Sequence, residues 1–173
     1  MKIIFLTGSH PRHAHIANAI NKSGFLSGLI IEKREDHVPE APKNLNADLK
    51  FLFNLHFKKR HDSEKKFFKE NNFPKTNILN VSKDELNSSK TIQFIKEIEP
   101  DLIMSYGVHK LSDDLMDSCK GEAWNIHGGL SPWYRGVATH FWPSYFLEPQ
   151  MTGMTIHDLT QDIDGGNIIH QNS

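Results

Sequence analysis

Short apolar runs alternate with stretches of helical spacing through the first 126 residues of the chain. The run over residues 1–7 predicts a strand buried on both faces, as in a parallel sheet. Pro11 can open the following helix, since the first helical turn does not need the N–H that proline lacks, and Gly24 can end it. Residues 29–31 predict a second strand, so this part of the chain is typical of a βαβ unit.

The same alternation continues along the chain. A charged, proline-containing loop is expected over residues 33–42. The apolar helical stripe that follows consists of Leu45, Leu49, Leu52, Phe53, His56 and Phe57. Further strands are expected at 77–81, 102–104 and 123–126, a helix at 92–98 and a short helical segment around Leu115. Strands that alternate with helices predict an α/β fold with a Rossmann-like, mostly parallel sheet flanked by helices.

The pattern changes after Trp124, where glycine, proline and aromatic residues crowd an irregular segment. Its aromatic residues are Trp133, Tyr134, Phe141, Trp142, Tyr145 and Phe146. Long irregular segments within a compact domain usually serve function rather than stability. We therefore expect the functional site in this part of the chain.

Composition narrows the class of protein. The 173 residues fit one domain, residues 1–173, and a formal net charge of −1 argues against a dedicated nucleic-acid partner. The single cysteine, Cys119, cannot form an internal disulfide, which excludes a disulfide scaffold. The apolar start over residues 3–6 is too short for a signal sequence or a membrane span. A cytoplasmic protein without a membrane partner is expected.

A basic stretch lies over residues 43–75, which contain nine Lys or Arg and four Asp or Glu. A solvated helix face explains it, and an anion-binding patch is the alternative.

Two polar residues flank Ile126 at the end of the expected strand over 123–126. The period of two places the side chains of Asn125 and His127 on one face, while Ile126 turns into the core. Glycines end this strand, so the pair lies at the carboxyl edge of the sheet, where open α/β sheets bind ligands. Asn can stabilise an oxyanion, and His can donate a hydrogen bond or move a proton near neutral pH. A turn Asn and a structural His are the alternative.

The surrounding sequence resembles the folate-dependent formyltransferases, which include glycinamide ribonucleotide transformylase, methionyl-tRNA formyltransferase and the sugar N-formyltransferases. Residues 124–136 read Trp-Asn-Ile-His-Gly-Gly-Leu-Ser-Pro-Trp-Tyr-Arg-Gly, which is similar to the Asn-X-His, Leu-X-Pro and Tyr-Arg-Gly pattern of that family. Residues 152–157 read Thr-Gly-Met-Thr-Ile-His, like its Thr-Gly-X-Thr-X-His strand. Residues 164–168 match its Asp-X-Gly-X-Ile turn. The resemblance covers about the last seventy residues, and the first half agrees as a βα pattern.

The resemblance implies that Asn125, His127 and Asp164 form the catalytic group. An acceptor amine would attack the formyl carbon of the co-substrate 10-formyltetrahydrofolate. Asn125 and His127 would then stabilise the oxyanion, and Asp164 would set the protonation state of His127 and help to remove the amine proton. An Asp-Gly-Gly sequence taken alone is typical of a simple turn.

The resemblance also implies two walls of a folate cleft. The expected cofactor-binding residues are Tyr106, Val108, His109 and Leu111 in one wall and Leu159 and Asp162 in the other. For Leu111 and Leu159, ordinary core packing is an alternative that is compatible with this role.

Acceptor-binding residues are expected at the turn after the first strand and in the irregular segment. They are Ser9, His10 and Arg12, together with Tyr134, Arg135 and Gly136. The turn departs from the glycine-rich phosphate turn of glycinamide ribonucleotide transformylase, because His10, Arg12 and His13 replace small residues. Cationic side chains can still bind a phosphate. No metal is expected, since no carboxylate or cysteine lies in step with these histidines.

The sequence therefore predicts an N-formyltransferase that acts on a primary amine of a small phosphorylated or nucleotide-linked acceptor, with an amino sugar as the first choice. Glycinamide ribonucleotide as acceptor, a non-catalytic folate- or nucleotide-binding module and a formyl hydrolase are the alternatives. A homodimer is left open. Family catalytic domains continue beyond the Asp-X-Gly-X-Ile turn, so a minimal member and a fragment are both compatible with a last residue at Ser173.

Overall fold

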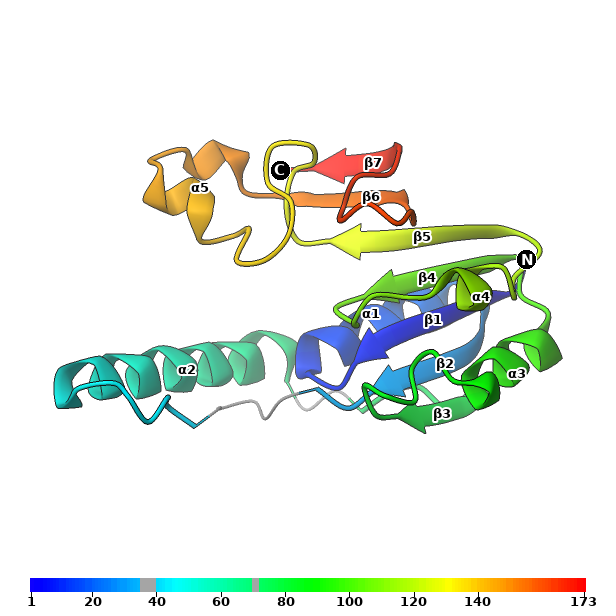
Figure 1. Cartoon of the computed structure of the whole chain (residues 1–173), viewed down its shortest axis with the longest axis horizontal. Helices are drawn as coiled ribbons and strands as arrows, with labels where there is room; N and C mark the ends of the chain where they lie inside the picture. Colours follow the sequence, from blue (N-terminus) through cyan, green and yellow to red (C-terminus); the bar gives the residue numbers. More distant parts are fainter. Residues whose placement is uncertain (35–39, 70–71) are drawn as a thin grey trace.

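A computed structural model of the chain describes residues 1–34, 40–69 and 72–173. Seven strands form one sheet in the order β3-β2-β1-β4-β5-β6-β7 (Figure 1). Their bounds are β1 (Ile3–Gly8), β2 (Leu26–Glu32), β3 (Ile78–Val81), β4 (Leu102–Tyr106), β5 (Glu122–His127), β6 (Met154–Asp158) and β7 (Ile168–Asn172). The strands expected in the first 126 residues are thus present. Residues 35–39 of the expected loop lie outside the described residues.

The sheet is parallel from β3 through β5 and antiparallel in its last two strands. β1 lies in the middle of the parallel part, where it pairs with β2 on one side and β4 on the other. β6 pairs antiparallel with β5, and β7 pairs antiparallel with β6. The prediction of a mostly parallel α/β sheet is confirmed. Because β6 runs antiparallel to β5, the segment that leaves the sheet after β5 returns to it directly beside β5.

Apolar side chains of β1 pack on both faces of the sheet. Ile4 and Leu6 belong to a core cluster that includes Ile95 of α3 (Ser89–Ile98) and Leu115 of α4 (Asp113–Met116). Phe5 points to the other face, where it packs with Ala17 of α1 (Pro11–Lys22). Helices therefore cover both faces of β1, as the uninterrupted apolar run predicts.

The helix boundaries follow from local chemistry. Pro11 is the first residue of α1, and Gly24 follows the helix with φ +80°, a left-handed conformation that favours glycine. Ser88 caps α3, since its side chain accepts a hydrogen bond from the backbone N–H of Thr91. Asn46 caps α2 (Ala47–Phe68) in the same way, with the N–H of Leu49 as donor at 2.9 Å.

Helix α2 is longer than the apolar stripe that predicts it, and it buries none of its residues. Leu49 and Leu52 are 49% and 56% exposed, so the stripe does not face the core. The helix contacts α1 and projects beyond the sheet (Figure 1). Its lysines are exposed, and Lys58 pairs with Asp62 at 2.7 Å, as in a solvated helix face.

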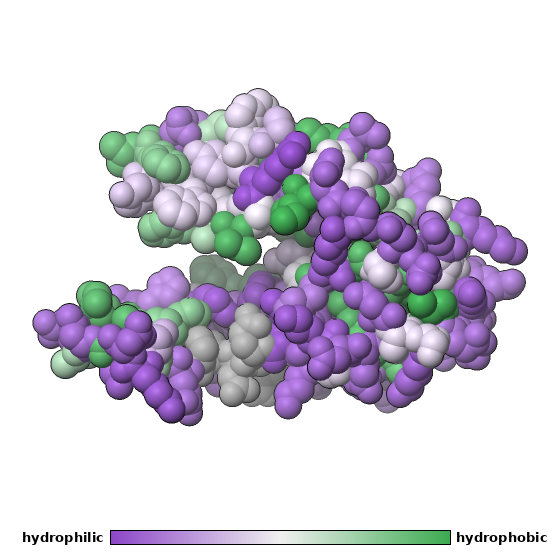
Figure 2. All heavy atoms as spheres, in the orientation of Figure 1, coloured by the Kyte–Doolittle hydropathy of each residue, from purple (hydrophilic) through white to green (hydrophobic). Residues whose placement is uncertain are grey.

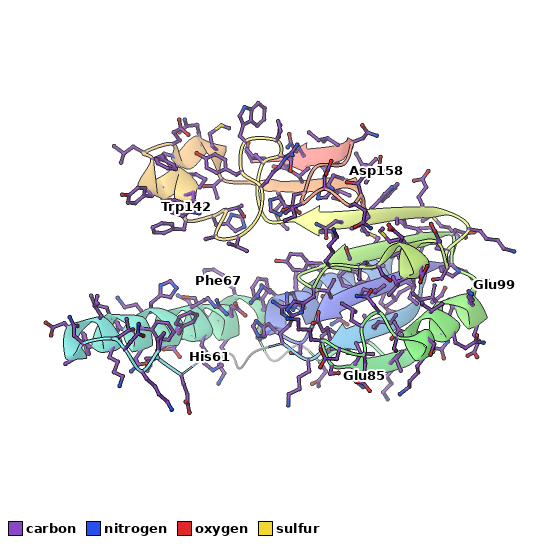
Figure 3. All side chains as sticks on the ribbon, in the orientation of Figure 1. His61, Phe67, Glu85, Glu99, Trp142 and Asp158 are labelled. Atoms are coloured by element: carbon purple, nitrogen blue, oxygen red, sulfur yellow. The ribbon has the colours of Figure 1, made fainter. Side chains whose placement is uncertain are left out.

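The irregular segment after β5 also projects beyond the sheet, on the same side as α2. It contains the short helix α5 (Trp142–Tyr145) and the 3₁₀ turn η1 (Pro149–Met151). Figure 2 shows an open hollow between this segment and α2. In Figure 3, Trp142 lies on the upper side of the hollow and Phe67 of α2 on the lower side. Both side chains are exposed. In the described ranges, every helix is too short or too polar to cross a membrane.

Candidate active site

Asn125 and His127 lie at the carboxyl end of β5 with their side chains on the same face of the sheet. Ile126 turns the other way and packs against the cluster around Phe5, as the period of two predicts. The amide oxygen of Asn125 accepts a hydrogen bond of 2.8 Å from the Ser105 hydroxyl at the end of β4. This bond fixes the amide so that Nδ2 is directed away from Ser105.

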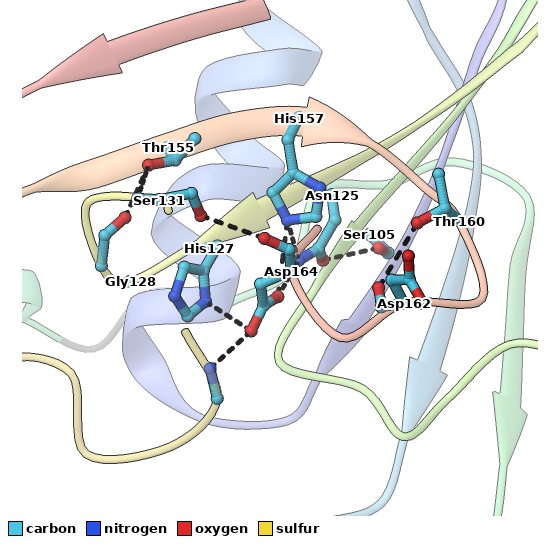
Figure 4. Close-up of polar contacts among 12 residues, drawn as sticks. Ser105, Asn125, His127, Gly128, Ser131, Thr155, His157, Thr160, Asp162 and Asp164 are labelled. Carbon is cyan, nitrogen blue, oxygen red and sulfur yellow. Dashed lines mark hydrogen bonds and ion pairs between the residues drawn. The ribbon is translucent and has the colours of Figure 1, made fainter. Parts of the chain in front are cut away.

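Asp164 reaches the same place from the turn between β6 and β7. Its backbone is left-handed, with φ 48°, and its carbonyl accepts a hydrogen bond of 3.2 Å from the Ser131 hydroxyl. The backbone N–H of Gly136 donates to Oδ2 of Asp164 at 2.8 Å. The aspartate is thus held by two residues of the segment that follows β5 (Figure 4).

The three residues expected to be catalytic are brought together around this carboxylate. Nδ1 of His127 lies 3.4 Å from Oδ2 of Asp164, and Nδ2 of Asn125 donates to Oδ1 at 3.3 Å. A second histidine, His157 of β6, lies with Nε2 3.4 Å from the same Oδ1 and 3.2 Å from Nδ2 of Asn125. Asp164 therefore stands between two imidazole rings and one amide.

The surroundings favour a charged pair between Asp164 and His157. Burial opposes the charge of Asp164, but hydrogen bonds from His157 and from the N–H of Gly136 outweigh it and lower the pKa of the carboxyl. Burial likewise opposes the charge of His157, yet its bonds to Asp164 and to the carbonyl of Asp158 raise the pKa of this ring. At neutral pH the carboxyl is a carboxylate.

His127 is held from its other side as well. Its Nε2 lies 2.8 Å from the carbonyl oxygen of Tyr134 and donates to it. The ring is buried, and Nδ1 faces Asp164 while Nε2 faces the carbonyl of Tyr134. The Tyr-Arg-Gly sequence of residues 134–136 thus contributes backbone atoms to both His127 and Asp164.

These residues line a cavity of about 620 Å³ at the carboxyl edge of the sheet. Asn125, His127 and Asp164 contribute to its wall. All six residues expected to bind the co-substrate line it too, namely Tyr106, Val108, His109, Leu111, Leu159 and Asp162. Its two long walls are the loop after β4 and the segment after β6, and Lys110 bridges them through a bond of 3.0 Å from its Nζ to the carbonyl of Gln161.

The residues expected to bind the acceptor lie apart from one another. Gly136 lines the cavity, whereas Ser9, His10, Arg12, Tyr134 and Arg135 do not. The hydroxyl of Tyr134 donates to Glu148 at 2.7 Å, and Arg12 pairs with Glu64 of α2 at 2.6 Å. His10 is buried.

The turn after β1 is filled by imidazole rings. The rings of His10 and His13 stack with centroids 5.5 Å apart, and a Cβ at Gly8 or Gly107 would lie within 2.7 Å of the His13 ring. Burial, followed by the charges of Arg12 and His10, lowers the pKa of His13 to about 2. His13 is therefore neutral and packs as a core residue. In the described part of the chain no three His, Cys, Asp or Glu residues gather as a metal site would require.

Sequence reasoning assigned no role to three residues near this cavity. His157 was part of the Thr-Gly-X-Thr-X-His motif, and the period of two from Thr155 could have placed it on the inner face of β6. Arg34 lines the cavity, and Glu32 is buried at the end of β2. Nothing in the local sequence signals these two, because their partners lie far along the chain.

Comparisons with known proteins find a curated relative of the chain. The chain is 35% identical over 116 residues to the bifunctional polymyxin resistance protein ArnA of Wigglesworthia glossinidia brevipalpis, a match that covers 65% of this chain and 18% of that protein. The chain thus spans under a fifth of the length of this curated relative.

Solved structures share the fold. Phosphoribosylglycinamide formyltransferase from Bacillus halodurans superposes with a TM-score of 0.60 at 20% identity, covering 99% of this chain and 78% of that one. The enzyme of the same name from Anaplasma phagocytophilum gives 0.63 at 18% identity, covering 99% and 70%. The formyl transferase family itself matches residues 1–173. The chain belongs to the formyl transferase family.

Proposed function

We propose that the chain transfers a formyl group from 10-formyltetrahydrofolate to a primary amine. The observation that carries the proposal is the grouping of Asn125, His127 and Asp164 in the wall of one cavity. An amide donor, an imidazole and a carboxylate supply what acyl transfer to an amine needs, namely stabilisation of an oxyanion and removal of a proton.

In the first step the amine nitrogen attacks the formyl carbon, and negative charge collects on the formyl oxygen. Nδ2 of Asn125 is available for this oxygen, because its bond to Asp164 is long, at 3.3 Å, and is readily exchanged for a shorter one. The Ser105 bond holds the amide in place while Nδ2 changes partners. For His127 to donate to the same oxygen, its Nε2–H has to leave the carbonyl of Tyr134.

In the second step the attacking nitrogen gives up a proton to the carboxylate of Asp164, directly or through water. The bond between the formyl carbon and N10 of the folate then breaks, N10 takes the proton that Asp164 received, directly or through water, and the formamide and tetrahydrofolate leave. The neighbouring His157 favours the carboxylate form that this step requires. The nucleophile belongs to the acceptor, so the protein needs no nucleophilic serine or cysteine.

We assign the remainder of the cavity to the co-substrate. Backbone amides of the loop over residues 106–111 suit the edge of a pterin, and Val108, Leu111 and Leu159 suit its faces. The roles of Tyr106, His109 and Asp162 belong to the same proposal.

For the acceptor we favour a nucleotide-linked amino sugar. Exposed aromatic residues of the segment after β5, such as Trp142 beside the hollow (Figure 3), offer stacking surfaces for a base or a sugar ring. Glycinamide ribonucleotide is the second candidate, because the solved structures with the same fold are phosphoribosylglycinamide formyltransferases. Against it, the turn after β1 is filled by His10 and His13.

Transfer assays with the purified chain test this function. The chain is incubated with 10-formyltetrahydrofolate and either glycinamide ribonucleotide or each of a panel of nucleotide-linked amino sugars. Formylated product is followed by mass spectrometry and free formate by enzymatic assay. We expect one nucleotide-linked sugar to be formylated at its amine without release of formate.

Two variants separate the alternatives. Asn125→Ala should lower kcat roughly 10²- to 10³-fold, the usual cost of one oxyanion donor. Asp164→Asn should abolish transfer while leaving folate binding in place. Formate release without an acceptor would indicate a hydrolase, and folate binding without turnover would indicate a binding module. Unchanged transfer by Asp164→Asn would exclude the role of this carboxylate.

A further inference from the structure

Glu32 is a buried carboxylate at the carboxyl end of β2. Its side chain is 0% exposed, although the strand that carries it is otherwise apolar over its buried part. Burial of a carboxylate is costly unless hydrogen bonds and a cation compensate for the lost water. The residues that compensate Glu32 therefore indicate what it does.

Both carboxylate oxygens bind the loop after β4. Oε2 accepts a hydrogen bond of 2.9 Å from the backbone N–H of His109, and Oε1 contacts Nδ1 of the same residue's ring. Arg34 approaches Oε1 to 3.7 Å with Nη1, which also lies 2.6 Å from Nδ1 and 3.2 Å from Nε2 of His109. Glu32 thus clamps one residue of the loop by its backbone and its side chain together.

The loop that Glu32 binds is a wall of the cavity. Residues 105–111 all line it, whereas Glu32 itself does not. The far end of the loop has its own support in Asn87, which donates to the carbonyl of Lys110 at 3.0 Å and accepts from the N–H of Ser112 at 2.8 Å. The backbone of the loop is thus held at His109 by Glu32 and at Lys110 and Ser112 by Asn87.

We propose that Glu32 is a positioning residue for the formyl donor: it acts through His109 to hold the loop over residues 106–111 in the form that binds the folate. This inference rests on the proposed function. Glu32 is outside the cavity and distant in sequence from Asn125, His127 and Asp164. Its loss therefore weakens donor binding and leaves the chemical step and acceptor binding in place.

Two variants test the clamp. Glu32→Ala removes both contacts, and Glu32→Gln keeps the shape and an oxygen for the N–H of His109 while removing the charge. For Glu32→Ala we expect about tenfold weaker binding of 5-formyltetrahydrofolate in calorimetry. We also expect an equal rise in the donor KM, with kcat and the acceptor KM within twofold of wild type. The folate affinity and donor KM of Glu32→Gln should lie between those of wild type and Glu32→Ala.

Amide hydrogen exchange gives a readout that needs no activity. Amides 107–111 should lose protection at least tenfold in the folate-free Glu32→Gln variant, while β1 and β4 keep theirs. Leu29→Ile is the matched control, because Leu29 is buried in the same strand and belongs to the core cluster on the other face of the sheet, which includes none of residues 107–111. It should leave folate affinity and loop exchange unchanged.

The outcomes separate the two proposals. If wild type and both Glu32 variants bind folate with equal affinity, the clamp is overturned and the proposed function stands. Equal loss of kcat, donor affinity and acceptor affinity would also overturn it, since a structural defect acts on all three. No folate binding by the wild-type chain would overturn the proposed donor and this inference with it. Should Glu32→Ala fail to fold, Glu32→Gln and the exchange data decide the matter.

Discussion

Two buried histidines, His13 and His157, are pushed in opposite directions by their neighbours. His13 is surrounded by other cationic groups and uncharged rings, which together with burial lower its pKa to about 2. His157 is equally inaccessible, at 2% side-chain exposure, but it faces the carboxylate of Asp164 and its pKa is raised. Burial alone thus does not decide the charge of a histidine, because the partner at 3–4 Å does.

His13 should make the fold sensitive to acid. Below pH 6.5 the unfolded chain protonates this residue and the folded chain does not. Stability therefore falls by up to about 1.4 kcal/mol per pH unit between pH 6.5 and 2. Urea unfolding at pH 7 and pH 5 measures it. His13 contributes about 2 kcal/mol to the loss of stability between pH 7 and pH 5, and this contribution should be absent in His13→Phe. An unchanged pH dependence would contradict a neutral His13.

His157 should act with the opposite sign. Its raised pKa gives a stabilising contribution that is complete below pH 6.5 and is lost as the pH rises through the folded-state pKa. Melting temperatures between pH 6 and pH 9 should fall for wild type, and this fall should be smaller in His157→Gln. Parallel curves for the two proteins would show that the ring is uncharged beside Asp164.

Among the connecting elements, the turn between β6 and β7 has the tightest backbone approach near the site. A Cβ at Gly166 would lie 1.9 Å from the carbonyl oxygen of Asp158, whereas one at Gly165 would first meet a side-chain carbon of Asp162 at 2.9 Å. The backbone of Asp158 also binds this turn, through a bond of 2.9 Å to the carbonyl of Asn167. The turn that carries Asp164 is therefore held directly on the end of β6.

Gly166→Ala should force this turn away from β6. We expect a loss of about 1–3 kcal/mol in the free energy of unfolding, as for other overpacked sites. We also expect a drop in formyl transfer larger than that of Gly165→Ala. Chemical denaturation and transfer assays of the two variants, run side by side, check this. Equal behaviour of the two alanines would mean that the turn can shift without cost to the site.

Elements with a strong periodic pattern were predictable from the sequence, and elements held by distant contacts were not. The uninterrupted apolar run at β1 predicts a strand, because a strand that is buried on both faces needs apolar residues at nearly every position. β7 was not expected, since its residues are mostly exposed and carry no clear alternation. Helix α2 continues past its apolar stripe because pairs such as Lys58–Asp62 and Arg60–Glu64 support its polar half.

The site shows the same division. Asn125 and His127 follow from the period of two on one strand, and Asp164 from its motif. The clamp by Glu32 could not be read from sequence, because it joins residues 77 positions apart.

At the scale of the whole molecule, stability is concentrated in the sheet and its covering helices. α2 has no buried residue and contacts α1 along only part of its length, so its outer half is held by little besides its own hydrogen bonds. Trypsin should therefore cleave first within residues 58–60, under conditions where the sheet remains folded. Mass spectrometry of the early fragments, with circular dichroism of the mixture, checks this. Resistance of these bonds up to global unfolding would indicate that a second molecule covers the helix.

The central pairing of β1 with β4 also governs how quickly the molecule can form. It joins positions 99 residues apart, such as Thr7 and Tyr106. The entropy cost of closing this long loop must be met before the contacts between the two strands can stabilise the fold. β5 in turn docks on β4, and the residues of the site follow β5. We therefore expect the helices to form early and the cavity to appear only after β1 and β4 have paired. Substitutions between β1 and β4 should then retard folding, and those in the loops of the site should mainly hasten unfolding.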